Sequence, residues 1–307
     1  MIHDPLLNPL FLPALARIGG LLLAGLVLVL AVERRRLRRP ATLRQSVLVV
    51  RVASWAVMAP TFVLSVFSGG AVALVLVLFL TVQGLREFAT VTGLDRAQRR
   101  LLLALGAAAV TVAAVLPSAY GALPLGGFLV LTAAALFRGG VEGSYRDVTV
   151  SLFGFMYLPL MLGFLPLIGR GLPDGSAALL VVGVCVALSD VCAFCVGNIA
   201  GGPRLAPRIS PNKTVAGAFG NVLGAYLGLA VMAGVAPAAW PVVITLALPI
   251  VIAVASIWGD LLESLVKRTF AVKDAGTLVP GFGGILDRID SLLLAMPLAY
   301  LALRLAG

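Results

Sequence analysis

Apolar runs long enough to cross a membrane, about 20 residues each, recur from one end of this chain to the other. The strands of a membrane β-barrel are shorter and alternate apolar with polar residues. Charged residues make up only 12% of the chain, whereas soluble proteins carry about 25%. The sequence therefore predicts an integral membrane protein of the all-α class, a polytopic transmembrane helical bundle.

We expect about ten transmembrane helices. Their approximate ranges are 13–32, 47–67, 70–85, 101–117, 123–138, 151–168, 177–197, 215–234, 239–259 and 288–305. With the N-terminus outside, the basic residues of the connecting segments fall on the inward side, as the positive-inside rule requires. These inward residues are Arg34, Arg35, Arg36, Arg38, Arg39, Arg44, Arg86, Arg96, Arg99, Arg100, Arg138, Arg146, Arg204, Arg208, Lys213, Lys267, Arg268 and Lys273. Outward segments hold little beyond Arg170.

The net charge of +10 is a second feature that needs an explanation. Strongly basic proteins often bind nucleic acid. Here, however, the cations are scattered over segments that would face anionic lipid, so membrane topology explains them more simply. We expect no nucleic-acid partner. The arginines of the segment 34–39 are interpreted as a topology anchor, with a lipid-binding patch as the alternative.

The character of the connecting segments changes near residue 175. Residues 1–175 are interpreted as N-terminal transmembrane helices without a carboxylate cluster, and residues 176–307 as a C-terminal catalytic region, whose inward segments are rich in Gly, Pro, Ser, Lys and Asp. One helix of the second region carries Ala216, Gly220, Gly224 and Gly228 at every fourth position. Small residues at this spacing allow another helix to approach closely. That partner helix belongs either to the same chain or to a second copy in a homodimer.

Three inward stretches of the second region contain the residues that could carry chemistry. In the first stretch, Asp190 lies inside a predicted span, where a carboxylate is costly and is by default a functional candidate. Ser210, Lys213 and Thr214 follow, directly before the next helix. Hydroxyl, ammonium and free backbone N–H groups at a helix start suit an anion such as phosphate. Helix capping and an ordinary loop charge are the alternative explanation.

The second stretch is WGDLLESLVKR, residues 258–268. Asp260, Glu263 and Lys267 recur at spacings of three and four, so they share one helical face, with Ser264 and Arg268 beside them. On a soluble helix such a face would simply be solvated. Directly after an apolar run, it is expected to line a polar cavity.

The third stretch is VPGFGGILDRID, residues 279–290. Gly283 and Gly284 belong to a glycine-rich turn that permits close approach of the backbone to a ligand. Asp287, Arg288 and Asp290 then lie on the first turn of the last predicted helix. Carboxylates also stabilise a helix start by themselves, but two acids and an arginine at membrane depth are more than a cap requires.

Together these stretches supply carboxylates, cations and hydroxyls. Carboxylates suit a hard divalent cation such as Mg²⁺, and Lys and Arg suit phosphates. A metal and cations that neutralise charge on phosphate oxygens are the general requirement of phosphoryl and nucleotidyl transfer. The sequence has no HExxH zinc motif and no Walker-type GxxxxGK[ST] motif, which argues against a zinc hydrolase and a P-loop ATPase.

The same residues resemble a known family. The run SLVKR, then KD, then PGFGGILDRIDS, between Ser264 and Ser291, is similar to the signature of the phosphatidate cytidylyltransferases, also called CDP-diacylglycerol synthases. The segment ISPNKT, 209–214, resembles a second motif of that family. The resemblance is clear over about residues 177–305 and weaker upstream, where Arg86-Glu87-Phe88 and 154–157 look similar.

The resemblance implies a bacterial inner (plasma) membrane enzyme with its active site facing the cytoplasm. Such an enzyme condenses CTP with phosphatidic acid and releases pyrophosphate and CDP-diacylglycerol. It implies Mg²⁺ as cofactor, held by Asp260 and Asp287. The residues expected to be catalytic are Asp260, Lys267, Asp287 and Arg288, and those expected to bind substrate are Ser210, Lys213, Thr214, Ser264, Arg268, Lys273, Gly283 and Gly284.

The chain departs from the family pattern at three positions. It has Phe282 where the family has His, Asn212 where the family usually has Lys, and Ala216 where the family has Glu. The alternatives left open are a paralogue that acts on another lipid phosphate, a CTP-dependent polyprenol kinase, and a non-catalytic protein that binds lipid or nucleotide. A transporter with Asp190 and Asp260 as ion sites is a further alternative, although the two halves show no self-similarity.

Overall fold

The computed structural model describes residues 4–36, 46–137, 144–281 and 283–306. Arg38, Arg39, Arg44, Arg138 and Phe282 therefore lie outside the described residues.

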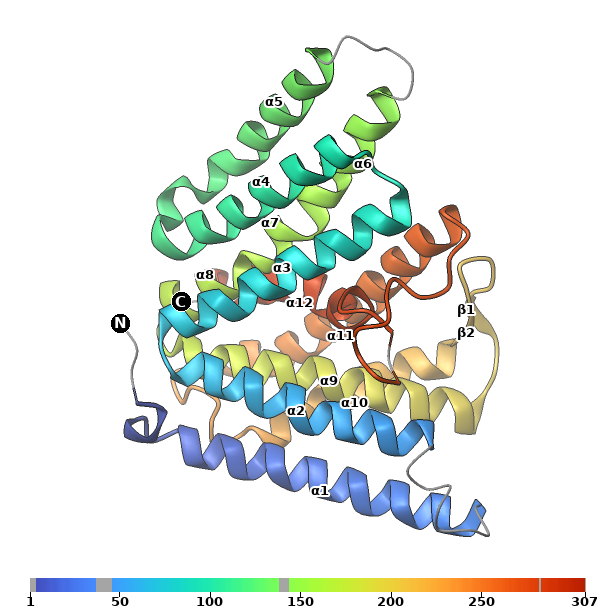
Figure 1. The fold of residues 1–307 in the computed structure, drawn as a ribbon. Coiled ribbons are helices and arrows are strands. Elements are labelled where there is room, and N and C mark those ends of the chain that lie inside the picture. The colour runs from blue at the N-terminus through green and yellow to red at the C-terminus, as the bar shows by residue number, and fades with distance from the viewer. Residues whose placement is uncertain (1–3, 37–45, 138–143, 282, 307) are drawn as a thin grey trace.

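The described chain is a bundle of long helices with one small hairpin of strands, so the predicted all-α membrane class is confirmed (Figure 1). The elements, in chain order, are η1 (Pro5–Leu7), α1 (Phe11–Arg36), α2 (Val47–Phe67), α3 (Gly70–Thr92), α4 (Arg96–Val115), η3 (Pro117–Ala122), α5 (Leu123–Leu136), α6 (Ser144–Tyr157), α7 (Pro159–Leu162), α8 (Phe164–Gly171), α9 (Gly175–Ala200), β1 (Arg204–Ala206), β2 (Ser210–Thr214), α10 (Val215–Val231), α11 (Val242–Thr269) and α12 (Leu286–Ala306).

Each of the predicted spans coincides with helical structure. Within the described residues, eight helical segments are long and apolar enough to cross a membrane. The other two predicted spans correspond to α10, which is apolar but shorter, and to α12, which carries charged residues in its first turn. Helices are expected here because a backbone in lipid must satisfy its own hydrogen bonds.

The predicted span 151–168 is not one continuous helix. It is divided into α6, α7 and α8, and the breaks fall at Leu158 and Gly163. Pro159 explains the first break, because proline lacks an N–H donor and clashes with the preceding turn. The Tyr120 hydroxyl donates to the carbonyl of Leu160, and thus satisfies an acceptor in the interrupted segment.

Three turns of the described chain that carry predicted inward residues lie at one end of the bundle. In Figure 1 the α3–α4 turn, the β1–β2 hairpin and the loop before α12 lie on the right, whereas the N and C marks lie on the left. The hairpin was not predicted. In it Ser210 pairs antiparallel with Ala206, and Thr214 pairs with Arg204. We call this end, with its hairpin and its loop 270–285, the polar end.

Helices α9 and α10 pack with their backbones almost in contact. A Cβ atom added at Gly224 would overlap the carbonyl group of Leu188, and one added at Gly228 would lie 2.6 Å from the Cα of Cys185. The stripe of small residues on α10 is therefore covered by a helix of the same chain. This packing accounts for the stripe without a second copy, and the homodimer stays a prediction.

This packing gives a first prediction. Gly224→Ala should lower the free energy of unfolding in detergent by about 1–3 kcal/mol, because the added methyl group forces α9 and α10 apart. The matched control is Gly126→Ala on α5, where an added Cβ meets nothing within 4 Å. Thermal unfolding of the two variants checks the expectation, and an equal melting temperature for both would contradict it.

Candidate active site

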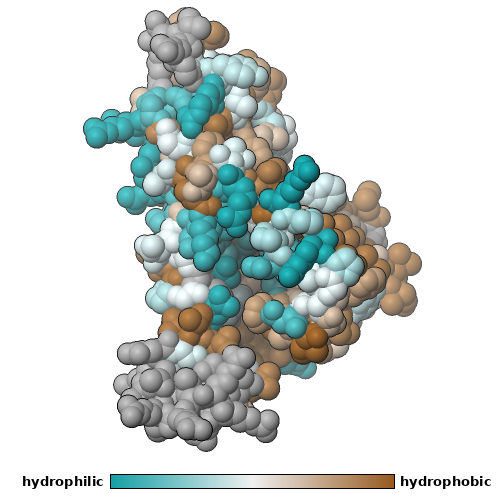
Figure 2. Space-filling view, turned by 90° about the vertical axis from the view of Figure 1, so that its right-hand side faces the viewer, coloured by the Kyte–Doolittle hydropathy of each residue, from teal (hydrophilic) through white to brown (hydrophobic). Residues whose placement is uncertain are grey.

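The polar end is hollowed, and hydrophilic residues gather round the hollow, as Figure 2 shows. Two helices supply most of the charged groups. Helix α11 has 28 residues, about 42 Å at 1.5 Å per residue, so it passes beyond the hydrocarbon layer of about 30 Å. Its apolar first part lies in the membrane and its last three turns carry the acids and lysine of the predicted face. Helix α12 begins beside it, at Leu286.

Lys267 is the centre of a largely buried ionic contact. Its Nζ lies 2.5 Å from Glu263 Oε2, one helical turn earlier, and 2.8 Å from Asp287 Oδ1 on α12. The Glu263 and Asp287 side chains are only 2% and 5% exposed. Two buried carboxylates therefore share one ammonium group, and this contact joins α11 to α12.

The second oxygen of Asp287 holds the loop that precedes α12. Asp287 Oδ2 accepts hydrogen bonds from the backbone N–H of Gly284 at 2.7 Å and of Ala275 at 3.0 Å. Gly283 packs against the same oxygen and has φ of +91°, a conformation that favours glycine. The predicted site residues Asp287, Gly283 and Gly284 are thus brought together.

A second ion pair lies closer to solvent. Lys213 Nζ on the hairpin contacts Asp260 Oδ2 at 2.6 Å, and Ser264 Oγ donates to Asp260 Oδ1 at 3.3 Å. The Asp260 side chain is 37% exposed. Three predicted residues from two separate stretches therefore meet, as a common polar cavity requires.

Asp190 and Asp290 complete the acidic side of this region. Ser291 Oγ donates to Asp190 Oδ1 at 3.2 Å, which links α9 to α12. The carboxylates of Asp190, Asp260 and Asp290 lie near enough for their negative charges to repel one another. Such a group of acids favours cations and disfavours additional anions unless a cation accompanies them.

The remaining predicted residues take several positions. Thr214 is buried, and its Oγ1 caps α10 by accepting from the N–H of Gly217 at 3.0 Å, so this hydroxyl oxygen already has a role in the fold. Ser210 is half-buried at the start of β2. Arg268 is exposed and its Nε donates to the carbonyl of Ile209, 3.4 Å away. Lys273 and Arg288 are exposed at the polar end.

Residues of the first half also belong to this region, which the sequence reasoning missed. On α2, the Ser54 hydroxyl donates to the carbonyl of Pro280 at 2.9 Å, and Arg51 Nε donates to the carbonyl of Gly281 at 3.1 Å. On α3, Glu87 accepts from the backbone of Ile285 and Leu286. The only sequence signal for these contacts was the faint resemblance around Glu87.

The division of the chain at residue 175 stays a prediction. The loop before α12 makes hydrogen bonds with residues on both sides of that division.

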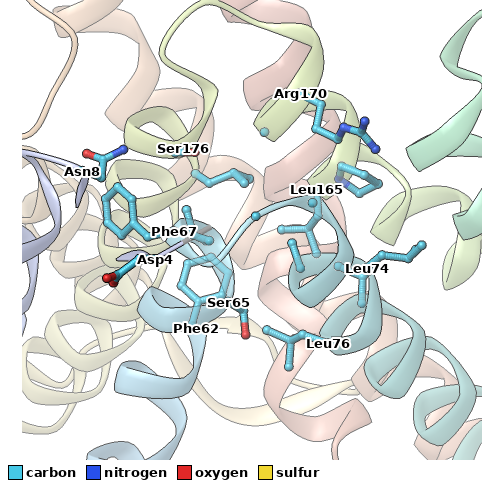
Figure 3. Close-up of a pocket in the computed structure, with 18 of the residues that line it drawn as sticks. Asp4, Asn8, Phe62, Ser65, Phe67, Leu74, Leu76, Leu165, Arg170 and Ser176 are labelled. Carbon is cyan, nitrogen blue, oxygen red and sulfur yellow. The ribbon is translucent and has the colours of Figure 1, made fainter. Parts of the chain in front are cut away.

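A separate cavity of about 450 Å³ lies at the opposite end, between η1, α2, α3, α8 and α9. Its walls are mostly apolar, with Phe62, Phe67, Leu74 and Leu165 among them (Figure 3). None of the predicted site residues lines it. Its chemistry gives no reason to place a reaction there, so the polar end is the candidate active site.

A family model described as "Cytidylyltransferase family" matches residues 49–306. The chain belongs to the cytidylyltransferase family. The resemblance drawn from the signature residues is thereby confirmed, and the match begins well upstream of the residues that carried it, so that it includes α2 and α3.

Curated relatives carry a more specific name. The phosphatidate cytidylyltransferase of Brucella suis biovar 1 (strain 1330) is 39% identical over 184 residues, which cover 59% of this chain and 66% of that protein. That of Staphylococcus epidermidis (strain ATCC 35984) is 35% identical over 167 residues, covering 52% and 64%. That of Bacillus subtilis (strain 168) is 42% identical over 117 residues, covering 38% and 44%. The matched region thus spans slightly less than two thirds of the first two relatives and less than half of the third.

The shared ammonium group gives a second prediction. Lys267→Met should lower the free energy of unfolding by about 3–5 kcal/mol, because it leaves two buried carboxylates without their cation. Thermal unfolding without substrates measures this, with Lys273→Met as the control, since Lys273 is exposed and makes no ion pair within the described residues. Adding Glu263→Gln to Lys267→Met should restore part of the loss. Equal melting temperatures for the Lys267 and Lys273 variants would disprove the assignment.

Proposed function

We propose that this protein condenses CTP with phosphatidic acid to give CDP-diacylglycerol and pyrophosphate. The chain is a membrane bundle of the cytidylyltransferase family. One observation carries the proposal: the buried group Glu263, Lys267 and Asp287 and the more exposed Lys213–Asp260 pair lie at the same end of this bundle. A lipid phosphate and a nucleotide could reach this end from the membrane surface and from water, respectively.

The proposed reaction is a displacement at phosphorus. A phosphate oxygen of phosphatidic acid attacks the α-phosphorus of CTP. The bond from that phosphorus to the oxygen bridging to the β-phosphate breaks, and pyrophosphate leaves with its electron pair. The cations Lys213, Lys267, Arg268 and Arg288 would offset the negative charge of the two substrates.

Mg²⁺ is the proposed cofactor, and the donor chemistry fits it. The described residues contain no group of three or more His, Cys, Asp or Glu side chains that would hold a metal alone. Mg²⁺ is commonly bound by one or two carboxylates together with substrate phosphates and water. The partly exposed carboxylate of Asp260 would bind it with the triphosphate, and Asp287 would join only by giving up one of its present contacts. When bound, Mg²⁺ would reduce the negative charge on the triphosphate.

The position of the site in the cell is also a proposal. The chain is an integral membrane protein, and the described turns that are predicted to face inward, between α3 and α4, in the hairpin and before α12, lie at the polar end. We place this end at the cytoplasmic surface of a bacterial inner membrane. The named relatives are bacterial proteins, which supports this placement.

The central test is pyrophosphate release by the purified protein in detergent with CTP, phosphatidic acid and Mg²⁺. Asp287→Asn should lower the rate at least about 100-fold, because it removes a charge that orders Lys267 and the loop before α12. The matched control is Asp174→Asn at the opposite end, where Asp174 has φ of +51° and asparagine is tolerated. Full activity of the Asp287 variant would refute the proposed site. Absence of pyrophosphate from folded wild-type protein would refute the proposed reaction.

The label in the product distinguishes the proposed reaction from the polyprenol kinase alternative. With CTP labelled at the α-phosphate, cytidylyl transfer places the label in the lipid product. With CTP labelled at the γ-phosphate, only phosphoryl transfer does so. We expect lipid label from the α-position alone.

The dependence on metal is a further expectation. Chelation with EDTA should abolish pyrophosphate release, and added Mg²⁺ should restore it, because the acidic groups at the polar end repel a nucleotide that arrives without a cation. Release that continues at the full rate in excess EDTA would contradict the proposed cofactor.

A further inference from the structure

Glu87 is a buried acid in the half of the chain where the sequence predicted no chemistry. It lies on α3 and is 6% exposed. Its Oε1 accepts from the N–H of Ile285 at 3.1 Å and from Gln83 Nε2 at 3.0 Å. Its Oε2 accepts from the N–H of Leu286 at 2.8 Å. A buried carboxylate is costly unless it is hydrogen-bonded, and here both oxygens are.

The two backbone donors belong to the start of α12. The first N–H groups of a helix have no acceptor within the helix, and the helix dipole favours a negative charge there. A residue just before the helix usually supplies that acceptor. Here the acceptor comes from another helix, 198 and 199 positions away in the chain. Glu87 therefore fixes the direction in which α12 begins.

Glycines form a cradle around the Glu87 carboxylate. A Cβ added at Gly284 would overlap Glu87 Oε2, and one added at Gly276 would lie 2.9 Å from Glu87 Oε1. Both residues belong to the loop that leads into α12. The loop thus lacks side chains at the two positions where the carboxylate fits.

Two carboxylates accept hydrogen bonds from three consecutive backbone N–H groups of this segment. The N–H of Gly284 goes to Asp287, and the next two N–H groups go to Glu87. A shift at Leu286 must move its neighbour Asp287, whose other oxygen contacts Lys267. A displacement of Glu87 would therefore displace Asp287 and Arg288, which follow Leu286 by one and two residues.

We propose that Glu87 is a positioning residue for cytidylyl transfer, holding the backbone of residues 285 and 286 so that Asp287 and Arg288 meet the substrates in the productive geometry. The inference rests on the proposed function. A misplacement of about 1 Å at a reacting group can cost about 100-fold in rate, which is why a residue that need not touch substrate can control catalysis.

The experiment compares wild-type protein with Glu87→Gln and Glu87→Asp in the full chain. Gln keeps the size but turns an NH₂ group toward a backbone N–H, and we expect kcat to fall about 10- to 100-fold with little change in the KM for phosphatidic acid. Asp keeps the charge with a shorter reach, and we expect a kcat between those of the wild type and the Gln variant.

A second measurement does not depend on activity. Amide hydrogen exchange, followed by mass spectrometry, should rise about tenfold for peptides covering residues 275–290 in Glu87→Gln, because this segment loses one of its two hydrogen bonds to residue 87 and the negative charge that strengthens the other. Peptides from α9 should be unchanged. The matched control is Thr92→Val one turn further along α3, which removes a buried hydrogen bond to the carbonyl of Phe88 but does not touch the loop.

Each outcome decides the proposal. Slower catalysis with faster local exchange, in the Glu87 variants and not in Thr92→Val, supports it. A Glu87→Gln variant with wild-type kcat, or one with unchanged exchange of residues 275–290, overturns it. So does the failure of both Glu87 variants to fold while Thr92→Val folds, since Glu87 would then be a folding determinant. If wild-type protein releases no pyrophosphate, the proposed function fails and the catalytic role with it, while the exchange measurement still decides whether Glu87 holds the loop.

Discussion

The polar end depends on one ammonium group between two buried carboxylates. Lys267 contacts Glu263 on its own helix and Asp287 on the next. Removing the ammonium group leaves two carboxylates without a cation in a poorly hydrated place, where uncompensated charge is costly. The same contact fixes how far α11 and α12 are rotated relative to each other. It therefore also determines where Asp260 and Arg288 lie.

The loop before α12 connects this contact to the first half of the chain. Val279 and Gly283 exchange two backbone hydrogen bonds, which close a tight turn. Helix α2 holds the turn through Ser54 and Arg51, and Glu87 on α3 holds the segment after it. The glycine-rich loop is consequently held by hydrogen bonds from α2, from α3 and, through Asp287, from α12. Such support suits a reaction that relies on positioning rather than on covalent chemistry by the protein.

The sequence predicted the membrane helices well, because burial in lipid requires continuous apolar residues that can be recognised in a single sequence. It did not predict the hairpin, whose strands are short and contain Pro211. The predicted span ended at residue 259, but the spacing of Asp260, Glu263 and Lys267 already indicated a helical face beyond it, and α11 does continue to Thr269. The chemistry of the stretches assigned Lys213 and Asp260 to one site, but the ion pair between them was not predicted. The contacts of Glu87 could not be predicted, because its partners are backbone N–H groups, which every residue except proline has.

The geometry of the glycine-rich turn also limits how this sequence can change in evolution. Gly281 and Gly283 have φ of +75° and +91°, which side chains rarely adopt, and Gly284 has no room for a methyl group beside Glu87. A side chain at any of these three positions would strain the backbone or overlap a neighbouring group, whatever the substrate. Position 282 lies between two of these glycines, and there this chain has Phe where the pattern it resembles has His. A comparison of natural sequences at this one position would show which lineages share this replacement.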